Sequence, residues 1–377
     1  MKFNTKCVHG SGRPDSTGAI SPAIYMSRTF SHPKLGDTTG YQYTRESNPT
    51  RDRLEQLIAG LEDGKDALAF SSGMAAVDAV FHLFSPGDHI ILGDDLYGGS
   101  IRMFTNIYEQ NGIEFTYVGT SDLDAVKAAF KPNTKAVYIE TPTNPMMEIT
   151  DIRALCALAH ERNALVIIDN TFLSPYFQKP LTLGADIVVH SGTKFIGGHH
   201  DVISGFTIVK DDELAAKLRL TYKTVGACLS AMDSWLVIRG VKTLALRMEQ
   251  HQKNAIALAE WLKKQPKVTK VLFPGLREHP GYEINKAQTT GFGGMLSFEV
   301  DSEETAKTVL EGIELIQFAE SLGGTESLLT YPVTQTHPDL KPEDAERKGI
   351  TRRLLRLSVG IEDTDDLIAD LEQAFNK

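Results

Sequence analysis

Short apolar segments alternate with amphipathic helical segments from residue 51 to residue 209, and this alternation limits the fold more than any other feature of the sequence. Strands that are apolar on both faces and separated by helices form a parallel or mostly parallel sheet that is covered on both sides. The sequence therefore predicts an α/β fold. The predicted strands are residues 67–70, 89–92, 115–118, 136–139, 164–169, 185–190 and 207–209, and the helices between them include residues 98–111, 121–130 and 151–162.

Polar side chains follow several of these strands at the point where each strand ends. In open α/β sheets, ligands bind at the carboxyl ends of the strands, so we expect these polar groups to converge on one site. Convergence of the whole set is much less probable by chance than a polar residue after any one strand. The set consists of Ser71–Gly73, Tyr97, Glu140–Asn144, Asp169 and Ser191–Lys194.

The loop after residue 190 carries Lys194 among hydroxyl groups and glycines. A lysine that is withdrawn from water tends to lose its proton, and a neutral amine is what a Schiff base requires. The hydroxyls of Ser191 and Thr193 are suitable partners for a phosphate. Together these groups indicate pyridoxal phosphate (PLP). Taken alone, however, such a loop is also compatible with an ordinary solvated turn.

A second anion-binding pattern occurs at Ser71–Gly73, which separates an apolar strand from a helix that begins near Met74. The backbone N–H groups at a helix N-terminus point toward an anion that lies in front of the helix. The alternative is a plain corner between a strand and a helix.

Composition and charge exclude several other classes of protein. The formal net charge of −10 disfavours sequence-independent nucleic-acid binding, which requires a basic surface. No apolar run reaches about 18 residues, and the start of the chain has no apolar signal region, so neither a membrane span nor export is expected. The 3 cysteines are far apart, which favours a reducing, cytoplasmic location. The His199–Asp201 run lacks the spacing of a metal site, and we expect no metal.

The chain outside the alternating region predicts further units. Residues 1–50 show no helical period and have no core of their own, so they must lie on a larger body or on a neighbouring subunit. After Pro266 and Pro274 a second unit begins, with strand-like segments that end in residues 354–359 and a closing amphipathic helix. We expect an N-terminal arm (1–55) that contributes to a neighbouring subunit, a large PLP-binding domain (56–250) and a C-terminal domain (251–377).

Eight motifs together resemble one family. They are Tyr43–Thr50, Ser71–Ala76, Asp94–Gly99, Glu140–Pro145, Asp169–Phe172, the Lys194 loop, Glu320–Gly324 and Arg356–Gly360. In this order they are similar to the Cys/Met-metabolism PLP enzymes, which include cystathionine β- and γ-lyases, cystathionine γ-synthases, methionine γ-lyases and homoserine-ester sulfhydrylases. The resemblance implies the PLP-dependent transferase fold type I (aspartate aminotransferase-like), with a mostly parallel sheet in a large domain and a smaller C-terminal α/β domain.

The resemblance also implies roles for the residues that match the family's motifs. Lys194 holds the cofactor through its ε-amino group and moves protons, and Tyr97 stacks over the cofactor ring and assists proton transfer. Asp169 pairs with the pyridine nitrogen and keeps it protonated, which makes the ring an electron sink. The expected phosphate ligands are the backbone N–H groups of Gly73 and Met74, the hydroxyls of Ser191 and Thr193, and, from the neighbouring subunit, Tyr43 and Arg45.

Substrate recognition is expected from the last strand. Arg356 resembles the arginine that binds the substrate α-carboxylate with both arms of its guanidinium group. Ser321, Asn144 and Tyr97 are further substrate-binding candidates, and Asn144 is also a ligand candidate for the 3-oxygen of the cofactor ring. The sharing of sites implied by Tyr43 and Arg45 predicts at least an obligate dimer, and the resemblance implies a homotetramer built as a dimer of dimers.

The reaction is indicated by the run Ser327–His337, which looks like that of bacterial cystathionine lyases. Thr330 stands where animal γ-lyases carry an acidic residue, so a strict animal-type γ-preference is not expected. We expect a carbon–sulfur lyase on cystathionine or related amino acids that releases ammonia, a 2-oxo acid and a thiol amino acid. The alternative is a γ-replacement transferase, namely cystathionine γ-synthase or O-acetylhomoserine sulfhydrylase. A non-enzymatic scaffold is disfavoured because no catalytic position of the family is lost.

Overall fold

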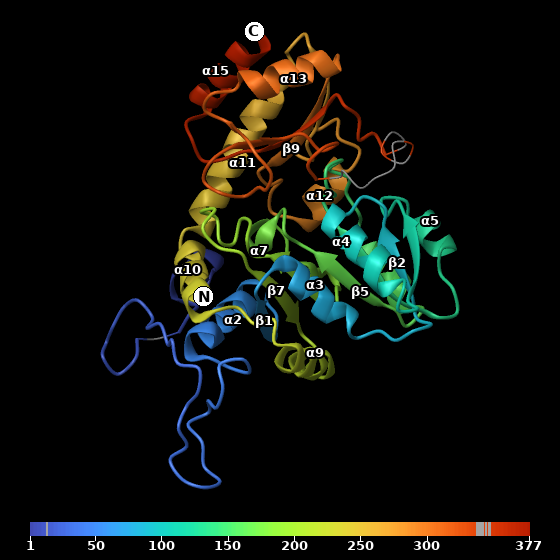
Figure 1. Cartoon of the computed structure of the whole chain (residues 1–377). Coiled ribbons are helices and arrows are strands. Elements are labelled where there is room, and N and C mark those ends of the chain that lie inside the picture. Colours follow the sequence, from blue (N-terminus) through green and yellow to red (C-terminus); the bar gives the residue numbers. More distant parts are fainter. Residues whose placement is uncertain (13, 337–342, 344, 346–347) are drawn as a thin grey trace.

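A seven-stranded sheet forms the centre of the larger unit of the chain (Figure 1). The computed structural model describes residues 1–12, 14–336, 343, 345 and 348–377. The strand order is β1-β7-β6-β5-β4-β2-β3, and every neighbouring pair is parallel except those that involve β7. The predicted mostly parallel sheet is confirmed. Its strands are β1 (Asp66–Phe70), β2 (His89–Gly93), β3 (Glu114–Val118), β4 (Thr134–Glu140), β5 (Leu165–Asp169), β6 (Ile187–Ser191) and β7 (Gly205–Val209).

Helices cover the sheet because each buries one apolar side against it. In α2, the residues at helical spacing, Leu54, Leu57, Ile58 and Leu61, are fully buried. The helices of this unit are α1 (Phe3–His9), α2 (Pro49–Leu61), α3 (Gly73–Phe81), α4 (Gly98–Met103), α5 (Leu123–Ala128), α6 (Ile152–His160), α7 (Ser174–Phe177), α8 (Pro180–Leu183), α9 (Asp212–Val225) and α10 (Ala231–Val241), with the π-helical turn η1 (Phe104–Tyr108) after α4.

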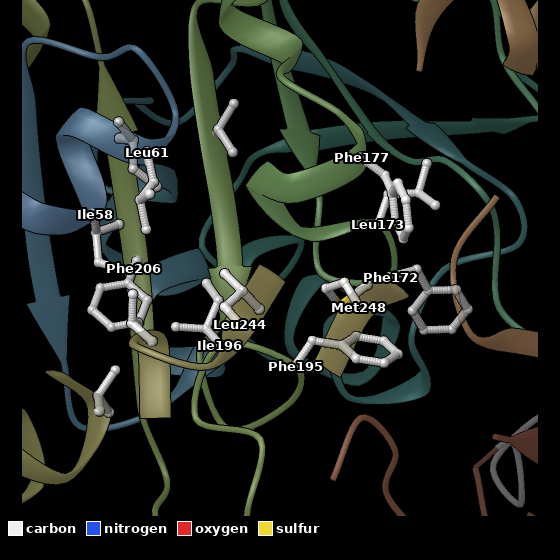
Figure 2. Packing of buried hydrophobic residues seen from close by; sticks show 14 of the residues in the cluster. Ile58, Leu61, Phe172, Leu173, Phe177, Phe195, Ile196, Phe206, Leu244 and Met248 are labelled. Atoms are coloured by element: carbon white, nitrogen blue, oxygen red, sulfur yellow. The ribbon is translucent and has the colours of Figure 1, made fainter. Parts of the chain in front are cut away.

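A buried apolar cluster supports the segment that contains Lys194 (Figure 2). It joins Ile58 of α2 and Phe206 of β7 to Phe195 and Ile196, which directly follow the lysine. Each large apolar side chain buried in this way stabilises the fold by roughly 1.5–3 kcal/mol. The backbone that follows Lys194, at Phe195 and Ile196, is therefore fixed by the core.

A second, five-stranded sheet forms the smaller unit, with the order β10-β11-β12-β9-β8. Its strands are β8 (Val268–Leu272), β9 (Met295–Val300), β10 (Gln317–Phe318), β11 (Leu328–Thr330) and β12 (Leu354–Ser358), and its helices include α12 (Tyr282–Gln288), α13 (Glu303–Gly312) and α15 (Thr364–Phe375). The long helix α11 (Leu244–Leu262) runs from one unit into the other (Figure 1). Met248 packs in the cluster of the larger unit, and Leu258 packs in the core of the smaller one. The predicted boundary at residues 250 and 251 therefore lies within a continuous helix.

One local prediction was wrong and one was correct in part. Residues 1–50 are not entirely irregular, because α1 forms at the N-terminus, buries Cys7 and places the Phe3 ring edge-on to that of Tyr176, with ring centroids 5.3 Å apart. The predicted helix 98–111 forms but ends at Tyr108 and changes type, since α4 passes directly into η1, where Phe104 stacks on Phe81 with ring centroids 4.3 Å apart. Aromatic packing, which a helical period does not report, decides the geometry there. Among the described residues, no helix combines the length and the apolar character needed to cross a membrane.

Candidate active site

A cavity of about 400 Å³ lies where the two sheets face each other. Side chains at the carboxyl ends of β4, β5 and β6 line it from one side, and Arg356 of β12 lines it from the other. Most of the residues singled out in the sequence border this cavity. They are Gly73, Met74, Tyr97, Asn144, Asp169, Ser191, Thr193, Lys194, Ser321 and Arg356.

Lys194 lies in the loop after β6, and its Nζ donates a hydrogen bond to Ser321 Oγ at 2.8 Å. Burial, and after it the positive charge of Arg356, lower the pKa of the Lys194 ammonium to about 8, and Glu320 acts in the opposite direction. The neutral amine is therefore accessible at mildly alkaline pH, as nucleophilic chemistry of a lysine requires.

Asp169 and Glu140 end adjacent strands, and they are paired in register between β5 and β4. The Oδ1 atom of Asp169 accepts a hydrogen bond from the Thr171 N–H at 2.9 Å. Burial raises the pKa of Asp169, and burial together with repulsion from Asp169 raises the pKa of Glu140. A cationic group placed beside Asp169 would reverse this shift, because it would stabilise the ionised carboxylate.

The N-terminus of α3 faces the cavity through Gly73 and Met74. Ser72 caps this helix, and its Oγ accepts the N–H of Ala75 at 3.0 Å. The N–H groups of Gly73 and Met74 have no acceptor within the helix itself and point toward an incoming anion. A Cβ atom on Gly73 would lie 2.9 Å from the Cβ of Ser191, so only glycine allows this close approach.

The two hydroxyls predicted to bind phosphate have different surroundings. The Thr193 Oγ1 donates to the Ser204 carbonyl at 3.1 Å and accepts from the Ser204 N–H at 3.0 Å. The Ser191 backbone N–H donates to Thr171 Oγ1 at 2.8 Å. The single hydroxyl proton of Thr193 is donated to the Ser204 carbonyl, so this side chain holds the loop closed. Ser191 instead lies next to the N-terminus of α3.

Arg356 is a buried cation whose partners are neutral. Its Nη1 donates to Asn144 Oδ1 at 2.8 Å, and its Nη2 donates to the Ser321 carbonyl at 3.0 Å and to Thr330 Oγ1 at 3.3 Å. Among the described residues, its Nε has no hydrogen-bond partner. Burial lowers the pKa of the guanidinium to about 10. A buried cation of this kind is costly unless an anion joins it, so the cavity is suited to a ligand carboxylate.

Tyr97 stands at the mouth of the cavity with 45% of its surface exposed. Its backbone N–H donates to Glu140 Oε1 at 2.9 Å, which fixes the start of α4. The ring lies over Gly99, where a Cβ atom would come within 2.4 Å of Tyr97 Cε1. The ring is therefore held by its backbone and free to cover a planar ligand.

Tyr43 and Arg45 do not border the cavity of their own chain. Both side chains are exposed, and the Arg45 guanidinium lies over the Tyr43 ring at 5.5 Å from its centroid. Arg45 Nη1 also donates to the Lys223 carbonyl. The N-terminal segment before α2 extends in loops away from the body of the molecule (Figure 1).

No group of three or more histidine, cysteine or acidic side chains in the described part of the chain is placed to hold a metal ion. His199 Nδ1 instead forms a hydrogen bond with the Gly197 carbonyl at 2.8 Å. His337, the last residue of the run that favours bacterial lyases, lies outside the described residues.

Comparison with known proteins assigns the chain to a family. Residues 4–376 match the family described as Cys/Met metabolism PLP-dependent enzyme. The chain belongs to this family. Three relatives are each 48% identical: cystathionine gamma-lyase of Bacillus subtilis and cystathionine beta-lyase of Lactococcus lactis subsp. cremoris, where the match covers 100% of this chain and 99% of each relative, and cystathionine gamma-synthase of Haemophilus influenzae, where it covers 97% and 95%.

Solved structures of the Cys/Met metabolism family agree with the fold. Cystathionine gamma-lyase from Lactobacillus plantarum complexed with L-serine superimposes with a TM-score of 0.98 at 48% identity, covering 100% of this chain and 99% of the other. Cystathionine gamma synthase from Xanthomonas oryzae pv. oryzae, in complex with aminoacrylate and cysteine, gives 0.97 at 39% identity, covering 100% and 98%. The expected PLP-dependent fold type I is thus confirmed.

Some cavity groups of this family member were not predicted, or were expected at the site without a role. Glu140 holds Tyr97, Thr171 holds both Asp169 and Ser191, and Glu320 acts electrostatically on Lys194. The strand-end rule placed Glu140 in the converging set, and it could have found Thr171, which lies just after a strand end. Nothing in the local sequence pattern around Thr330, which contacts Arg356, identifies that contact.

Proposed function

We propose that this chain is a PLP-dependent carbon–sulfur lyase that acts on cystathionine or a related sulfur amino acid. The products are ammonia, a 2-oxo acid and a thiol amino acid. The observation that carries the proposal is the location of Arg356, a buried cation with neutral partners, in the same cavity as Lys194 and Asp169. An amino acid offers the carboxylate that Arg356 lacks and the amino group that can exchange with Lys194.

The residues around the cavity fit PLP. The unpaired first N–H groups of α3, at Gly73 and Met74, suit its phosphate, and Ser191 and Thr193 border the same region. The buried carboxylate of Asp169 suits a protonated ring nitrogen, and the amine of Lys194 suits its aldehyde. When bound, PLP supplies an electron sink for charge that develops at the substrate Cα.

The chain's own groups then have distinct tasks. The guanidinium of Arg356, with Asn144 and Ser321 beside it, holds the substrate carboxylate and so orients the Cα–H bond. The Nζ of Lys194, neutral once it has given up its proton, accepts the proton from Cα and returns it later in the cycle. Tyr97 covers the cofactor ring and assists proton transfer through its hydroxyl.

We extend the proposal to the assembly. Tyr43 and Arg45 are exposed and lie outside their own cavity, which supports a role at the phosphate of a neighbouring subunit in a homotetramer of two dimers. The corresponding domains are the arm 1–55, the PLP-binding domain 56–250 and the C-terminal domain 251–377. The free state of Cys7, Cys156 and Cys228 supports a cytoplasmic location.

The relatives include enzymes of a different reaction class. Cystathionine gamma-synthase of Haemophilus influenzae is as similar to this chain as the lyases are. The alternative function is therefore γ-replacement, as in cystathionine γ-synthase or O-acetylhomoserine sulfhydrylase. Lysis and replacement differ by a few kcal/mol in barrier, which a few pocket groups decide.

Two assays with the holoenzyme separate these functions. The first measures pyruvate and 2-oxobutyrate released from cystathionine, and the second measures cystathionine formed from cysteine and an acylated homoserine. We expect 2-oxo acid in the first assay. Product in the second assay alone would overturn the lyase assignment. The ratio of pyruvate to 2-oxobutyrate reports whether the bond on the β- or the γ-carbon is broken.

A further inference from the structure

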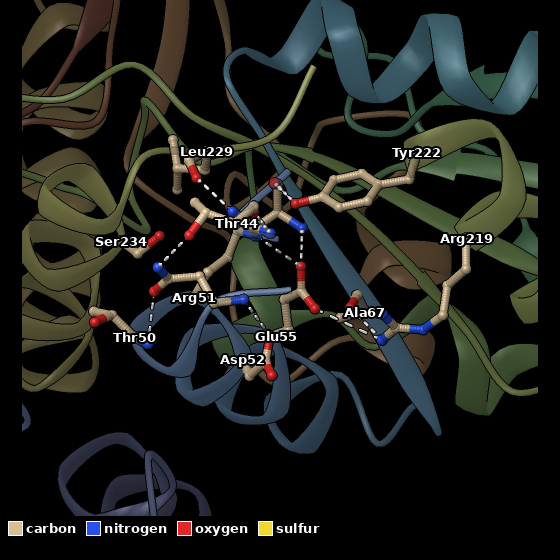
Figure 3. A network of polar contacts seen from close by, with 12 residues as sticks. Thr44, Thr50, Arg51, Asp52, Glu55, Ala67, Arg219, Tyr222, Leu229 and Ser234 are labelled. Carbon is tan, nitrogen blue, oxygen red and sulfur yellow. Dashed lines mark hydrogen bonds and ion pairs between the residues drawn. The ribbon is translucent and has the colours of Figure 1, made fainter. Parts of the chain in front are cut away.

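A fully buried arginine, Arg51, connects the N-terminal segment to the body of the subunit (Figure 3). It lies in the first turn of α2, and its Nη2 donates to the Thr44 carbonyl at 2.6 Å. Its Nη1 donates to the Leu229 carbonyl at 3.1 Å. One planar group thus bridges two segments that are 185 residues apart (229 minus 44).

The same guanidinium is oriented by groups around β1. Glu55 Oε1 lies 3.8 Å from Arg51 Nε and accepts the Ala69 N–H at 3.1 Å. The Tyr222 ring lies under the guanidinium, with its centroid 5.5 Å away, and its hydroxyl donates to the Ala69 carbonyl at 2.9 Å. Ala69 is next to the last residue of β1, the strand that leads into the Ser71–Gly73 turn.

Arg219 completes this network at the protein surface. It lies 3.6 Å from Glu55 Oε2 and donates from Nε to Asp66 Oδ2 at 2.6 Å. Burial raises the pKa of Glu55 to about 7, while Arg219 and Arg51 oppose that increase. The carboxyl group is therefore held between two cations, and Arg51 is fixed by more than its two carbonyl partners.

Thr44 lies between Tyr43 and Arg45, so the contact with Arg51 fixes the backbone from which both side chains project. Arg45 also packs against the loop before Leu229, because a Cβ atom on Gly226 would lie 2.9 Å from Arg45 Cδ. The Gly226 φ of +84° places this residue in the left-handed region that favours glycine. The segment 43–45 is thus anchored at its centre and braced at one end.

A guanidinium is a poor choice if stability alone is required. Its main partners are neutral carbonyls, and replacing a buried charge with apolar groups is frequently neutral or stabilising. A planar fork that reaches two carbonyls, however, sets the distance and the angle between the two segments. The arrangement therefore favours a geometric role.

We propose that Arg51 is a positioning residue that presents Tyr43 and Arg45 to the cofactor phosphate in the neighbouring subunit. This inference rests on the proposed sharing of sites. It also makes Arg51 a link between the neighbouring subunit's phosphate site and the subunit's own. The Leu229 carbonyl that Arg51 holds belongs to a loop that pairs with the end of β1, and the Ser71–Gly73 turn follows β1 directly.

The test compares the binding of PLP with that of pyridoxal, which lacks the phosphate. Holoenzyme is stripped of cofactor and refilled with either compound, and dissociation constants are measured by absorbance for wild type, Arg51→Met, Arg45→Ala and the double variant. Arg53→Met, on the same helix, is the matched control. We expect Arg51→Met to weaken PLP binding about tenfold with pyridoxal binding unchanged. In the double variant only Tyr43 remains to be positioned, so we expect its loss of PLP affinity to be smaller than the product of the two single losses.

The outcomes separate the inference from its basis. The quantity compared is the affinity for PLP divided by the affinity for pyridoxal. If Arg45→Ala leaves this ratio unchanged, the proposed sharing of sites is wrong. If Arg45→Ala lowers the ratio and Arg51→Met does not, the proposed role of Arg51 is wrong. Equal weakening of both compounds by Arg51→Met indicates a purely structural role and also overturns it. Arg51→Lys, which keeps the charge but loses the fork, covers the case in which Arg51→Met does not fold, and its ratio is expected to fall as well.

Discussion

The two sheets contribute to the cavity in different ways. The seven-stranded sheet provides groups at strand ends, where Asp169 closes β5 and Ser191 closes β6. The five-stranded sheet provides Arg356 from the middle of β12. At a strand end the backbone pairing stops, so a polar side chain finds N–H partners in the following turn, as Asp169 does with Thr171. A guanidinium in the middle of a strand has no turn beside it to provide hydrogen-bond partners.

This difference indicates a division of labour. The strand-end groups are suited to a cofactor that stays, because turns and helix termini hold them in place. Arg356 is suited to a ligand that comes and goes, because its hydrogen-bond partners are neutral and Glu320 and Glu140 act on it only electrostatically. Changes on the two sides of the cavity should therefore have different kinetic and thermodynamic signatures.

The largest effect is expected for Lys194→Ala. Loss of the amine removes both the covalent attachment and the base, and general-base catalysis alone contributes roughly 10²–10⁴-fold. We expect 2-oxo acid release to fall by at least about 10³-fold. Lys65→Ala, an exposed lysine paired with Asp212, is the control. Activity within tenfold of wild type would rule out Lys194 as the reactive group.

Asp169→Asn is the next test on the strand-end side. The amide keeps the shape but cannot stabilise a protonated ring nitrogen, and hydrogen bonds to charged groups contribute roughly 1.5–3 kcal/mol. We expect kcat to fall about 100-fold with a small change in KM. A shift in the visible absorbance of the holoenzyme should accompany the loss. If KM alone increases, Asp169 binds substrate and the division of labour is wrong.

On the other side, Arg356→Met should raise KM about 30-fold, because the substrate loses its charged partner. It should also stabilise the cofactor-free chain by about 1 kcal/mol, since a buried charge without a hydrogen-bonded anion is removed. Substrate saturation curves and urea unfolding test these two effects. Arg353→Met, at an exposed arginine paired with Glu299, is the control. A less stable variant would contradict the account of Arg356 as a costly cation.

The last effect concerns the dependence of stability on pH. The Lys194 pKa is about 8 in the folded chain and 10.5 in its ordinary environment. Between these values the unfolded chain binds more protons than the folded chain, so the free energy of unfolding increases with pH. We expect cofactor-free wild type to gain at most about 3 kcal/mol relative to Lys194→Met as the pH rises from 8 to 10.5. If the free energies of unfolding of the two proteins change with pH in the same way, the inference that Lys194 is a buried lysine with a lowered pKa is wrong.

The predictability of the two sides from sequence differs for the same physical reason. The alternation of apolar strands and helices predicted the sheet, and the strand-end rule placed Asp169, Gly73 and Lys194 together. Arg356 was expected only through resemblance to the family, because nothing in an alternating strand says which residue across the molecule it will face. Thr330, its neighbour on β11, was read only as a mark of the reaction. Long-range pairing of this kind is fixed by the packing of the two units.

The N-terminal segment was predicted in its general character and missed in detail. The absence of a helical period indicated an arm, yet α1 forms because Phe3 and Cys7 find apolar neighbours that are distant in the sequence. The alternating region was predicted to begin at Arg51, and the carbonyl partners of this residue at Thr44 and Leu229 do not follow from the local pattern. Its position three residues before the buried Leu54, at helical spacing, was the available signal.

The hydrogen bond from Lys194 to Ser321 joins the two units of the molecule through the amine that we propose to be reactive. A ligand that takes over this nitrogen breaks that hydrogen bond, so occupation of the amine and contact between the two units are linked. We therefore expect a mutation that weakens this contact to change the reactivity of the nitrogen atom.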